Sequence, residues 1–284
     1  MSTPILVTGA TGTIGQALVK QLQARGASFA VMSSKPRREV GGLATVQGDM
    51  ADAASLRTAF AGVDTLFLLF PYQANAVELA RNAVQAAQEA GVKHIVRSSG
   101  AGADVNSPVA IAQMQGTIDQ LIEQSGIPYT LLRPNGFMQN WVNFSAAQIK
   151  AGSYAAPNGD GAISVIDVRD IAEVAAIVLT NPAAHAGKVY TLSGGEALST
   201  AQQLAMIAAA VGHPVRYDDI SEAQAKAAML GWGMDAQVVA WTLSLSYVYK
   251  QGWGAGISPD VQALTGHAPR RFADFVAENT AVWR

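Results

Sequence analysis

Residues 5–15 read ILVTGATGTIG, a short apolar run followed by three glycines with the spacing G-x-x-G-x-x-G. The apolar run predicts a buried strand, and the pattern from Gln16 onward predicts a helix. Gly9 can turn tightly off the strand, Gly12 has no Cβ to hold a diphosphate away, and Gly15 lets the helix pack closely. The helix amino terminus offers unpaired N–H groups and partial positive charge to phosphates. The strand-to-helix context favours a dinucleotide-binding turn over chance turn glycines.

The bulk composition indicates a compact globular protein with a substantial core. Half of the 284 residues are hydrophobic and 14% are charged, and the net charge of −2 comes with no basic run. Nothing therefore suggests a nucleic-acid or anionic-membrane partner. The absence of cysteine excludes disulfides, thiolate catalysis and thiolate metal ligands, and it is compatible with a cytoplasmic location. No signal peptide is expected before the first strand, and the apolar segment 238–249 is too short to span a bilayer.

Six predicted strands alternate with helices along the first half of the chain. The strands cover 5–7, 27–32, 45–48, 65–69, 94–97 and 129–133, and the main helices cover 16–25, 75–90 and 109–124. The apolar strands lack period-2 patterning, which indicates a parallel sheet covered on both faces. The predicted fold class is therefore α/β, a Rossmann-type doubly wound parallel sheet.

Ligands of such sheets bind over the carboxyl ends of the strands, so the residues after each strand are the candidate cofactor contacts. They are Gly9, Thr11, Gly12, Thr13 and Ile14; Ser33, Ser34, Lys35 and Arg37; Asp49 and Met50; Leu69, Phe70 and Pro71; Ser98 and Ser99; and Asn135 with the preceding Pro134.

The loop after the second strand selects between the two nicotinamide dinucleotides. An NAD(H) site places an acid here for the ribose 2′-hydroxyl, whereas this chain has SSKPRR at 33–38 and no acid before Glu39. Hydroxyls and a guanidinium accept a 2′-phosphate through charge-assisted hydrogen bonds. We therefore expect NADP(H), the alternative being a solvated basic loop.

The regular alternation of predicted strands and helices ends at Gly136, and the rest of the chain is predicted to be mainly helical. We expect helices over 137–151, 169–180, 200–211, 222–230, 236–250 and 272–280, with strands over 163–166 and 189–192. The expected division is 1–155 as an NADP(H)-binding domain, rejoined by strands within 163–193, and 156–284 as a smaller substrate-binding region. Late aromatic residues could line a pocket, although helical spacing favours ordinary core: Trp232, Trp241, Tyr247, Tyr249 and Trp253.

Several short motifs in order and spacing resemble the NmrA-like branch of the atypical short-chain dehydrogenase/reductases, in particular bacterial NAD(P)H-dependent quinone, azo-dye and triphenylmethane reductases. They are TGATGTIG at 8–15, GD at 48–49, GVKHIV at 91–96, GIPYTLLRP at 126–134, GFM at 136–138 with Asn140, DVRDIA at 167–172, GKVY at 187–190, and LTG at 264–266 with PR at 269–270.

The resemblance implies a Rossmann domain that binds NADP(H) and a smaller domain that closes over the nicotinamide. By position, the turn residues already named would hold the diphosphate, and Ser33, Lys35 and Arg37 would lie near the 2′-phosphate, although the family often has arginine at position 33. The implied adenine contacts are Asp49 and Met50, the ribose and nicotinamide contacts Phe70 and Pro71, and the nicotinamide border Ser98 and Asn135.

The chain departs from the wider superfamily in its catalytic group. That group is Ser, Tyr and Lys, in which Tyr donates a proton to a carbonyl and Lys lowers its pKa. Ser99 fills the serine place and is the one catalytic candidate. The Tyr and Lys places fall on Ile111 and Gln115, which cannot do that work.

Two functions fit this departure. One is a reductase of electron-poor acceptors, to which hydride adds directly, with an apolar pocket of Phe70, Tyr72, Phe137, Met138 and Trp141. Packing under the cofactor is the alternative reading of 137 and 138. The other is an NADP(H) sensor without turnover, disfavoured because no DNA-reading element or added regulatory segment is evident. Isomerase or epimerase chemistry would need the missing Tyr.

The remaining histidine and carboxylate residues give little evidence for a metal site or a catalytic group. The four histidines are scattered without ligand spacing, so no metal site is expected. Asp167 and Asp170 open a predicted helix and are interpreted as its cap and a first-turn partner of the helix dipole rather than as paired catalytic carboxylates.

Overall fold

The computed structural model describes residues 3–35, 39–40 and 42–284 and divides into two compact units. The first unit comprises Met1–Pro108, Ala112–Arg133 and Ile171–Tyr190; the second comprises Val109–Ile111, Pro134–Asp170 and Thr191–Arg284. After the short segment Val109–Ile111, the second unit resumes at Pro134, the last residue of a sheet strand, and the expected boundary at 155/156 lies inside its segment Pro134–Asp170.

An eight-stranded sheet with the order β10-β7-β6-β5-β1-β2-β4-β3 forms the centre of the first unit. Numbering β1, β2, β4, β5, β6 and β7 along the chain gives the spatial order 3-2-1-4-5-6, with each neighbouring pair parallel. This is the Rossmann order, which confirms the predicted fold class. The short β3 pairs antiparallel with β4. The strands are β1 Thr3–Val7, β2 Phe29–Ser33, β3 Glu39–Val40, β4 Leu43–Gln47, β5 Val63–Leu68, β6 His94–Ser98, β7 Tyr129–Pro134 and β10 Lys188–Leu192.

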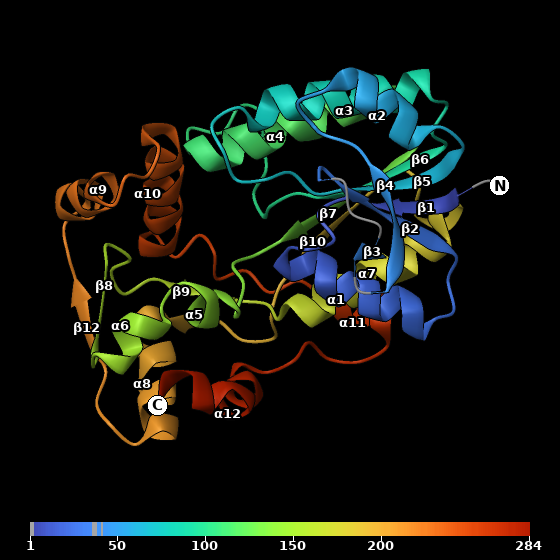
Figure 1. Ribbon diagram of the computed structural model, residues 1–284. Helices are drawn as coiled ribbons and strands as arrows, with labels where there is room; N and C mark the ends of the chain where they lie inside the picture. The colour runs from blue at the N-terminus through green and yellow to red at the C-terminus, as the bar shows by residue number, and fades with distance from the viewer. Residues whose placement is uncertain (1–2, 36–38, 41) are drawn as a thin grey trace. The chain divides into compact units, whose positions relative to one another are not determined.

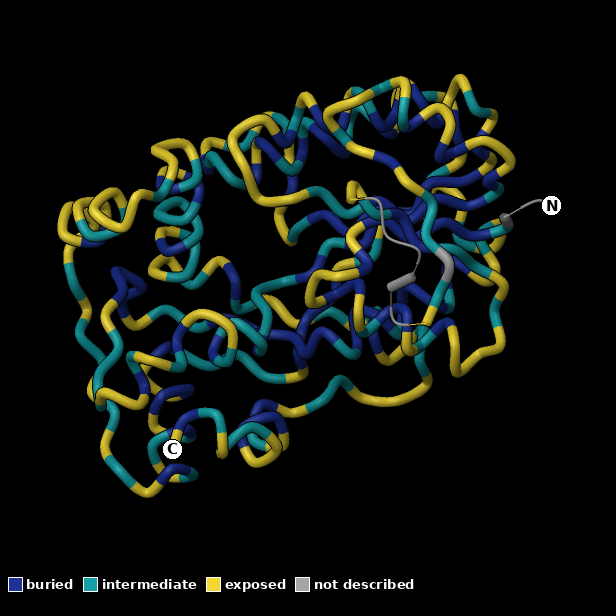
Figure 2. Tube along the Cα trace, in the orientation of Figure 1, coloured by how far each residue is buried: buried dark blue, intermediate teal, exposed yellow. Residues whose placement is uncertain are grey.

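Helices cover both faces of this sheet (Figure 1). On one face lie α2, α3 and α4, and on the other α1 and α7. Their bounds are α1 Thr13–Ala24, α2 Ala53–Phe60, α3 Ala76–Glu89, α4 Ala110–Glu123 and α7 Val168–Thr180, and a 3₁₀ turn, η1, covers Pro182–His185. Leu6, Leu66 and Ile95 of the sheet pack in one core with Phe60 and Ile122 of the helices. Figure 2 shows the strands buried between helices whose outer faces are exposed.

The second unit has its own core and two small sheets. β8 Ser153–Ala156 pairs parallel with β12 Arg216–Asp219, and β9 Ala162–Ile163 pairs antiparallel with β11 Leu198–Ser199. The helices are α5 Asn140–Asn143, α6 Ala146–Lys150, α8 Thr200–Val211, α9 Glu222–Gly231, α10 Ala236–Lys250, α11 Asp260–Thr265 and α12 Phe272–Trp283. Met138, Leu204, Phe272 and Trp283 are among its core residues.

Two expected elements of this unit differ in the structure. The helix over 137–151 is instead the short pair α5 and α6, broken where Asn143, Phe144 and Ser145 supply poor helix formers. The strand over 163–166 shortens to β9, because Ser164 N donates to Gly254 O and Ile166 N donates to Gly136 O, in place of a continuous strand ladder.

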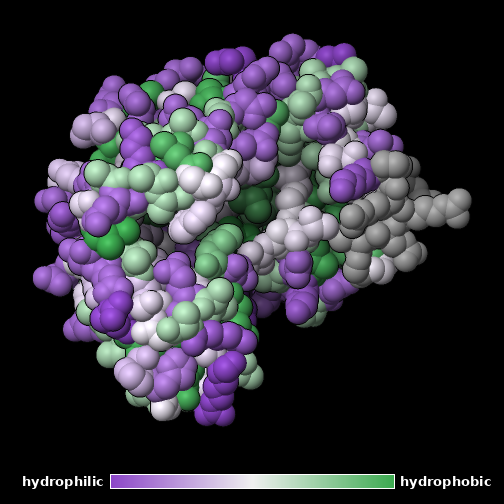
Figure 3. Space-filling model, turned by 60° about the vertical axis from the view of Figure 1, so that its left-hand side comes forward, coloured by the Kyte–Doolittle hydropathy of each residue, from purple (hydrophilic) through white to green (hydrophobic). Residues whose placement is uncertain are grey.

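The surface mixes residue types. Hydrophilic and hydrophobic residues are interspersed over the face shown in Figure 3. Within the described ranges, no helix combines the length and the apolar character needed to cross a membrane.

Candidate functional site

Thr8 joins the carboxyl ends of β1 and β5. Its Oγ1 donates to Phe67 O at 2.9 Å and accepts from Leu69 N at 3.0 Å. The next residues are in close contact, because a Cβ on Gly9 would lie 3.1 Å from Leu69 Cδ2. The predicted cofactor residues after these two strands are therefore brought together.

The glycine turn after β1 has the geometry that its spacing predicts. Gly9 has φ +67°, and Gly12 N closes the turn by donating to Gly9 O at 2.9 Å. A Cβ on Gly15 would lie 2.1 Å from Gly9 O, so the start of α1 packs directly on the turn. Gly12 is the N-cap of α1, is exposed, and makes no side-chain capping bond. Of the predicted phosphate contacts, four are exposed and one is buried: Gly9, Thr11, Gly12 and Thr13 against Ile14.

The loop after β2 begins with a turn stabilised by a serine. Ser33 Oγ donates to Lys35 O at 3.0 Å and accepts from Lys35 N at 3.3 Å. Ser34 and Lys35 are exposed, whereas Ser33 is half-buried. Arg37 lies outside the described residues. The described part of the loop therefore offers hydroxyls and an ammonium to a ligand at the end of β2.

Backbone and side-chain bonds also fix the segment that follows β4. Asp49 is exposed and its Oδ1 accepts from Ala51 N at 2.9 Å. Met50 is half-buried, and its carbonyl accepts from Asn82 Nδ2 at 3.2 Å. Asp49 thus remains accessible to solvent, while Met50 packs partly against the core of the first unit.

The residues after β5 run from half-buried to exposed. Leu69 and Phe70 are half-buried, and Pro71 and Tyr72 are exposed. The guanidinium carbon of Arg97 lies 6.0 Å from the centre of the Phe70 ring, within cation–π range. A buried cation therefore lies beside one of the predicted cofactor contacts.

That cation belongs to a buried cluster between β6 and α4. Arg97 and Asp119 form an ion pair, each about 1% exposed. Ser99 Oγ accepts from Arg97 Nη1 at 2.9 Å and donates to Asp119 Oδ2 at 3.0 Å. Arg133 also donates to Asp119 Oδ2 at 3.0 Å, and Gln115 accepts from Arg97 through its backbone and side-chain oxygens. Burial, and then repulsion from Arg133, lowers the pKa of Arg97 to about 9.

The cluster gives structural roles to two of the three superfamily catalytic places. The hydroxyl hydrogen of Ser99 is committed to Asp119, and Gln115 is committed to Arg97. Ile111 opens α4 and its N donates to Ser244 Oγ at 3.1 Å. By contrast, Ser98 Oγ is buried at the end of β6 without a hydrogen-bond partner among the described residues, so it can still bond a ligand.

Asn135 follows β7 in the second unit and is held by several bonds. Its Nδ2 donates to Ser164 Oγ at 2.9 Å and to Gly254 O at 2.8 Å. Its Oδ1 accepts from Gly136 N at 2.9 Å, and its backbone N donates to Leu192 O at 2.9 Å. The side chain therefore fixes the local backbone, and a nicotinamide contact by Asn135 remains a proposal.

The four predicted substrate contacts separate into two groups. Tyr72 is exposed and Phe137 is half-buried, so both stay candidates. Met138 is 1% exposed in the core of the second unit. Trp141 is 8% exposed in the same core, and its Nε1 donates to Gln203 Oε1 at 2.7 Å. Met138 and Trp141 thus pack in this core, and their role as substrate contacts stays a prediction.

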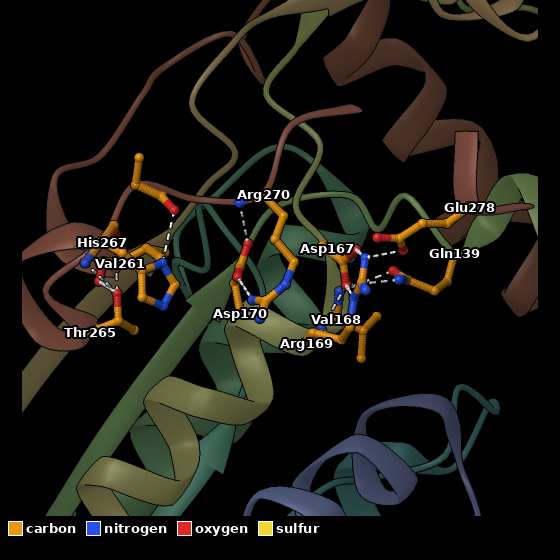
Figure 4. A network of polar contacts seen from close by, with 11 residues as sticks. Gln139, Asp167, Val168, Arg169, Asp170, Val261, Thr265, His267, Arg270 and Glu278 are labelled. Atoms are coloured by element: carbon orange, nitrogen blue, oxygen red, sulfur yellow. Dashed lines mark hydrogen bonds and ion pairs between the residues drawn. The ribbon is translucent and has the colours of Figure 1, made fainter. Parts of the chain in front are cut away.

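Asp167 and Asp170 open α7, and each faces an arginine (Figure 4). Asp167 Oδ1 accepts from Arg169 N at 2.8 Å, so it caps the helix. Its burial favours the neutral carboxyl, but bonds from Arg169 and Gln139 outweigh that effect and lower its pKa. Asp170 pairs with Arg270 instead of meeting only the helix dipole, and burial raises its pKa. Both carboxylates are fully buried. Asp167 caps α7, and Asp170 in the first turn of this helix is held by Arg270.

Sequence reasoning missed the buried Arg97–Asp119–Arg133 cluster. The available signal was an arginine directly after Ile95 and Val96 in a predicted buried strand, because a buried arginine requires an acidic partner. Sequence reasoning also did not distinguish the buried from the exposed aromatic residues near the end of the chain. Trp241 is buried, whereas Trp232, Tyr247 and Trp253 are exposed.

Comparisons with known proteins agree with this arrangement. A model described as the NmrA-like family matches residues 1–253. The NAD(P)H azoreductase of Xenophilus azovorans is 38% identical, covering 98% of this chain and 99% of the relative. The NADPH-dependent quinone oxidoreductase of Escherichia coli, solved with NADPH, has a TM-score of 0.87 at 29% identity, covering 96% and 99%. The triphenylmethane reductase of a Citrobacter species, solved with NADP(H), has a TM-score of 0.82 at 26% identity, covering 98% and 99%.

Proposed function

Because the chain belongs to the NmrA-like family, we propose that it is an NADPH-dependent reductase of electron-poor, planar small molecules such as quinones, azo dyes and triphenylmethane dyes. The observation that carries this proposal is the glycine turn at α1 combined with the loss of the Tyr and Lys places. The near full-length similarity to an azoreductase and a quinone oxidoreductase supports the same class of acceptor.

The first unit fits a bound dinucleotide. A side chain at Gly12 would occupy the space over the amino end of α1, where a diphosphate can approach the backbone. Ser98 Oγ, buried and without a partner among the described residues, offers a hydrogen bond at the end of β6. When bound, the dinucleotide supplies a hydride. Ser33, Ser34, Lys35 and Arg37 would hold its 2′-phosphate.

The chain's own residues limit the acid–base chemistry. Ser99 and Gln115 are committed to the Arg97 cluster, and the hydrocarbon side chain of Ile111 cannot transfer a proton. We infer that the acceptor must take hydride without protonation by these three places, which selects electron-poor acceptors. Positioning and exclusion of water then supply most of the rate, with Phe70, Tyr72 and Phe137 as the proposed apolar contacts.

The direct test follows the loss of NADPH absorbance with a panel of quinones, azo dyes and activated enones. We expect turnover of at least one acceptor class and faster turnover with NADPH than with NADH. Tight NADPH binding without turnover of any acceptor would favour a sensor. Calorimetry that detects no binding of NADPH would overturn both functions.

A further inference from the structure

A polar cavity of about 340 Å³ lies beside α4, and it shares no residue with the predicted cofactor contacts. The loop after β6, one side of α4 and the end of β7 line it, and all of its lining residues belong to the first unit. The charged and amide side chains among them are Asp104, Asp119, Gln120, Glu123 and Arg133. A volume of this size is at the lower end for small-molecule sites, so the cavity has room for a small polar molecule.

The loop that walls the cavity is held against α4. A Cβ on Gly116 would lie 2.2 Å from Asp104 C and 2.3 Å from Val105 N, so the loop backbone lies directly on the helix. Asp104 N donates to Ala112 O at 3.1 Å, and Asp104 Oδ1 accepts from Asn106 N at 2.9 Å. Because this wall is already ordered, a ligand would pay little conformational entropy to bind against it.

Arg133 presents unused hydrogen-bond donors to the cavity. Its Nε donates to Asp119 Oδ2 at 3.0 Å, and its Nη2 lies 3.0 Å from the same oxygen. Its Nη1 bonds no other residue in the described part of the chain, and 24% of the side chain is exposed. Asp119 also pairs with Arg97 and accepts from Ser99, so two arginines share one carboxylate and one positive charge remains. The outer edge of the Arg133 guanidinium can therefore bind a ligand carboxylate through two hydrogen bonds.

Two exposed carboxylates line the same cavity. Glu123 lies one turn of α4 beyond Asp119, so both face the cavity from one side of the helix. Glu123 forms no hydrogen bond or ion pair with another described residue, and Asp104 Oδ2 likewise has no partner among them. Both carboxylates are thus available to accept hydrogen bonds from a ligand ammonium group, and both would repel a simple anion.

We propose that this cavity binds a small zwitterion, an amino acid whose carboxylate pairs with Arg133 and whose ammonium group pairs with Glu123 and Asp104. A simple carboxylate would bind Arg133 but meet two acidic side chains, and a simple amine would bind the acids but meet the arginine. Only a ligand with both charges complements both sets of side chains. The inference goes beyond the proposed function, because none of these residues is a predicted cofactor or acceptor contact.

The test measures binding by calorimetry and saturation-transfer NMR with glycine, β-alanine and 4-aminobutanoate, which separate the two charges by increasing lengths. Acetate and methylammonium carry one charge each and are the ligand controls. Arg133→Met and Glu123→Gln each remove one of the proposed partners. Arg57→Met and Glu78→Gln are the matched control variants, because both residues are exposed on other helices of the first unit. Circular dichroism and thermal unfolding check the fold of each variant.

We expect at least one of the three zwitterions to bind with a Kd of about 1 mM or lower, and acetate and methylammonium to bind at least about tenfold more weakly. Arg133→Met should raise the Kd of that zwitterion by about 10- to 100-fold, and Glu123→Gln by about threefold. Arg133→Lys keeps the charge without the two-pronged geometry and should recover part of the affinity, which separates binding from a folding defect. The two control variants should leave the Kd unchanged.

The proposal is overturned if none of the three zwitterions binds, or if Arg133→Met and Glu123→Gln bind as the wild type does. Equal affinity for acetate would make the cavity an anion site, equal affinity for methylammonium would make it a cation site, and either result overturns the proposal. Losses of the same size in Arg57→Met and Glu78→Gln would also overturn it, because they would show a general effect of charge. Glu123 is exposed, so its variant decides the question even if Arg133→Met does not fold. None of these measurements requires NADPH or turnover, so failure of the proposed function would be seen separately.

Discussion

At the scale of single residues, two glycines of the opening turn separate cofactor binding from folding. A Cβ on Gly15 would meet Gly9 O at 2.1 Å and Ala10 Cα at 2.7 Å, both backbone atoms that cannot move aside. A Cβ on Gly12 would meet Gly9 O at 3.3 Å, a much milder contact. Gly12 has φ −80°, which alanine adopts readily.

We therefore expect Gly12→Ala to keep the fold and to raise the Kd for NADPH at least about tenfold, because the methyl group holds the diphosphate away. Gly15→Ala should lower the free energy of unfolding by about 3 kcal/mol. Thermal unfolding and calorimetry with NADPH measure both effects. Equal cofactor affinity in wild type and Gly12→Ala would remove the diphosphate assignment.

Ser99 is the residue at which a catalytic and a structural role can be distinguished. Its hydroxyl bridges Arg97 and Asp119. Ser99→Ala should cost about 1–2 kcal/mol of stability, since it leaves buried charged groups with one bond fewer. kcat should fall far less than the roughly hundredfold that removal of a general acid causes. A loss of that size in a folded variant would restore Ser99 as proton donor.

Arg37 is proposed to recognise the 2′-phosphate. A guanidinium–phosphate bond contributes about 1.5–3 kcal/mol. Arg37→Ala should therefore raise the Kd for NADPH by roughly 10- to 100-fold. NADH lacks the 2′-phosphate, and its Kd should barely change. Arg25→Ala, which alters the C-cap of α1 instead, is the control for general charge loss. Fluorescence titrations with NADPH and with NADH measure both dissociation constants. An equal loss of affinity for the two dinucleotides would contradict the assignment of Arg37 to the 2′-phosphate.

At the scale of elements, the sequence was informative where a local pattern determines the structure. The glycine spacing predicted the β1–α1 turn, and long amphipathic or alanine-rich runs predicted α3 and α4 to within a residue or two at each end. Ser199 and Ser221, each three residues before a glutamine, form complete capping boxes.

Partners distant in sequence were not predictable in the same way. Arg97 and Asp119 are 22 residues apart, and only the packing of α4 on β6 reveals that they meet. β12 reads RYDD and carries no strand pattern, yet it pairs with β8. The apolar run of α10 looks like core in one dimension, because the sequence does not show which of its sides other elements leave uncovered.

The two capping boxes should have different energetic value because their helices pack differently. Leu204 and Ile207 of α8 lie in the core of the second unit, whereas α9 buries only Ala225. Ser199→Ala should reduce the free energy of unfolding by about 1 kcal/mol. Ser221→Ala should mainly increase local fraying of α9, seen as faster amide hydrogen exchange. The opposite ranking in denaturant titrations would show that α9 is part of the cooperative core.

At the scale of the whole molecule, stability depends on pH through groups whose pKa changes on folding, and a buried histidine is one of them. His94 is 3% exposed, and its Nε2 lies 2.9 Å from Thr130 Oγ1. Thr130 donates its own proton to His185 O, so His94 donates to Thr130 through Nε2–H. Burial, and then the nearby His185, lowers the pKa of His94 to about 4.

The sign of the resulting pH dependence is fixed by linkage. The folded pKa lies below the unfolded value of about 6.5, so between these values the unfolded chain binds more protons and stability falls as pH falls. The full loss, reached below pH 4, is at most about 3.4 kcal/mol. Asp167, with a lowered pKa, adds to the loss, and Asp170, with a raised pKa, opposes it. The histidine contribution is therefore isolated only by comparing variants.

His94→Gln keeps a donor toward Thr130 but cannot take up a proton. We expect its free energy of unfolding to decline less steeply than that of the wild type between pH 6.5 and 4, with the two curves converging as the pH falls. Urea titrations across this pH range measure the difference, since the slope of stability against pH counts protons taken up on unfolding. Parallel curves for wild type and His94→Gln would mean that folding does not lower the pKa of His94, which would contradict the burial argument.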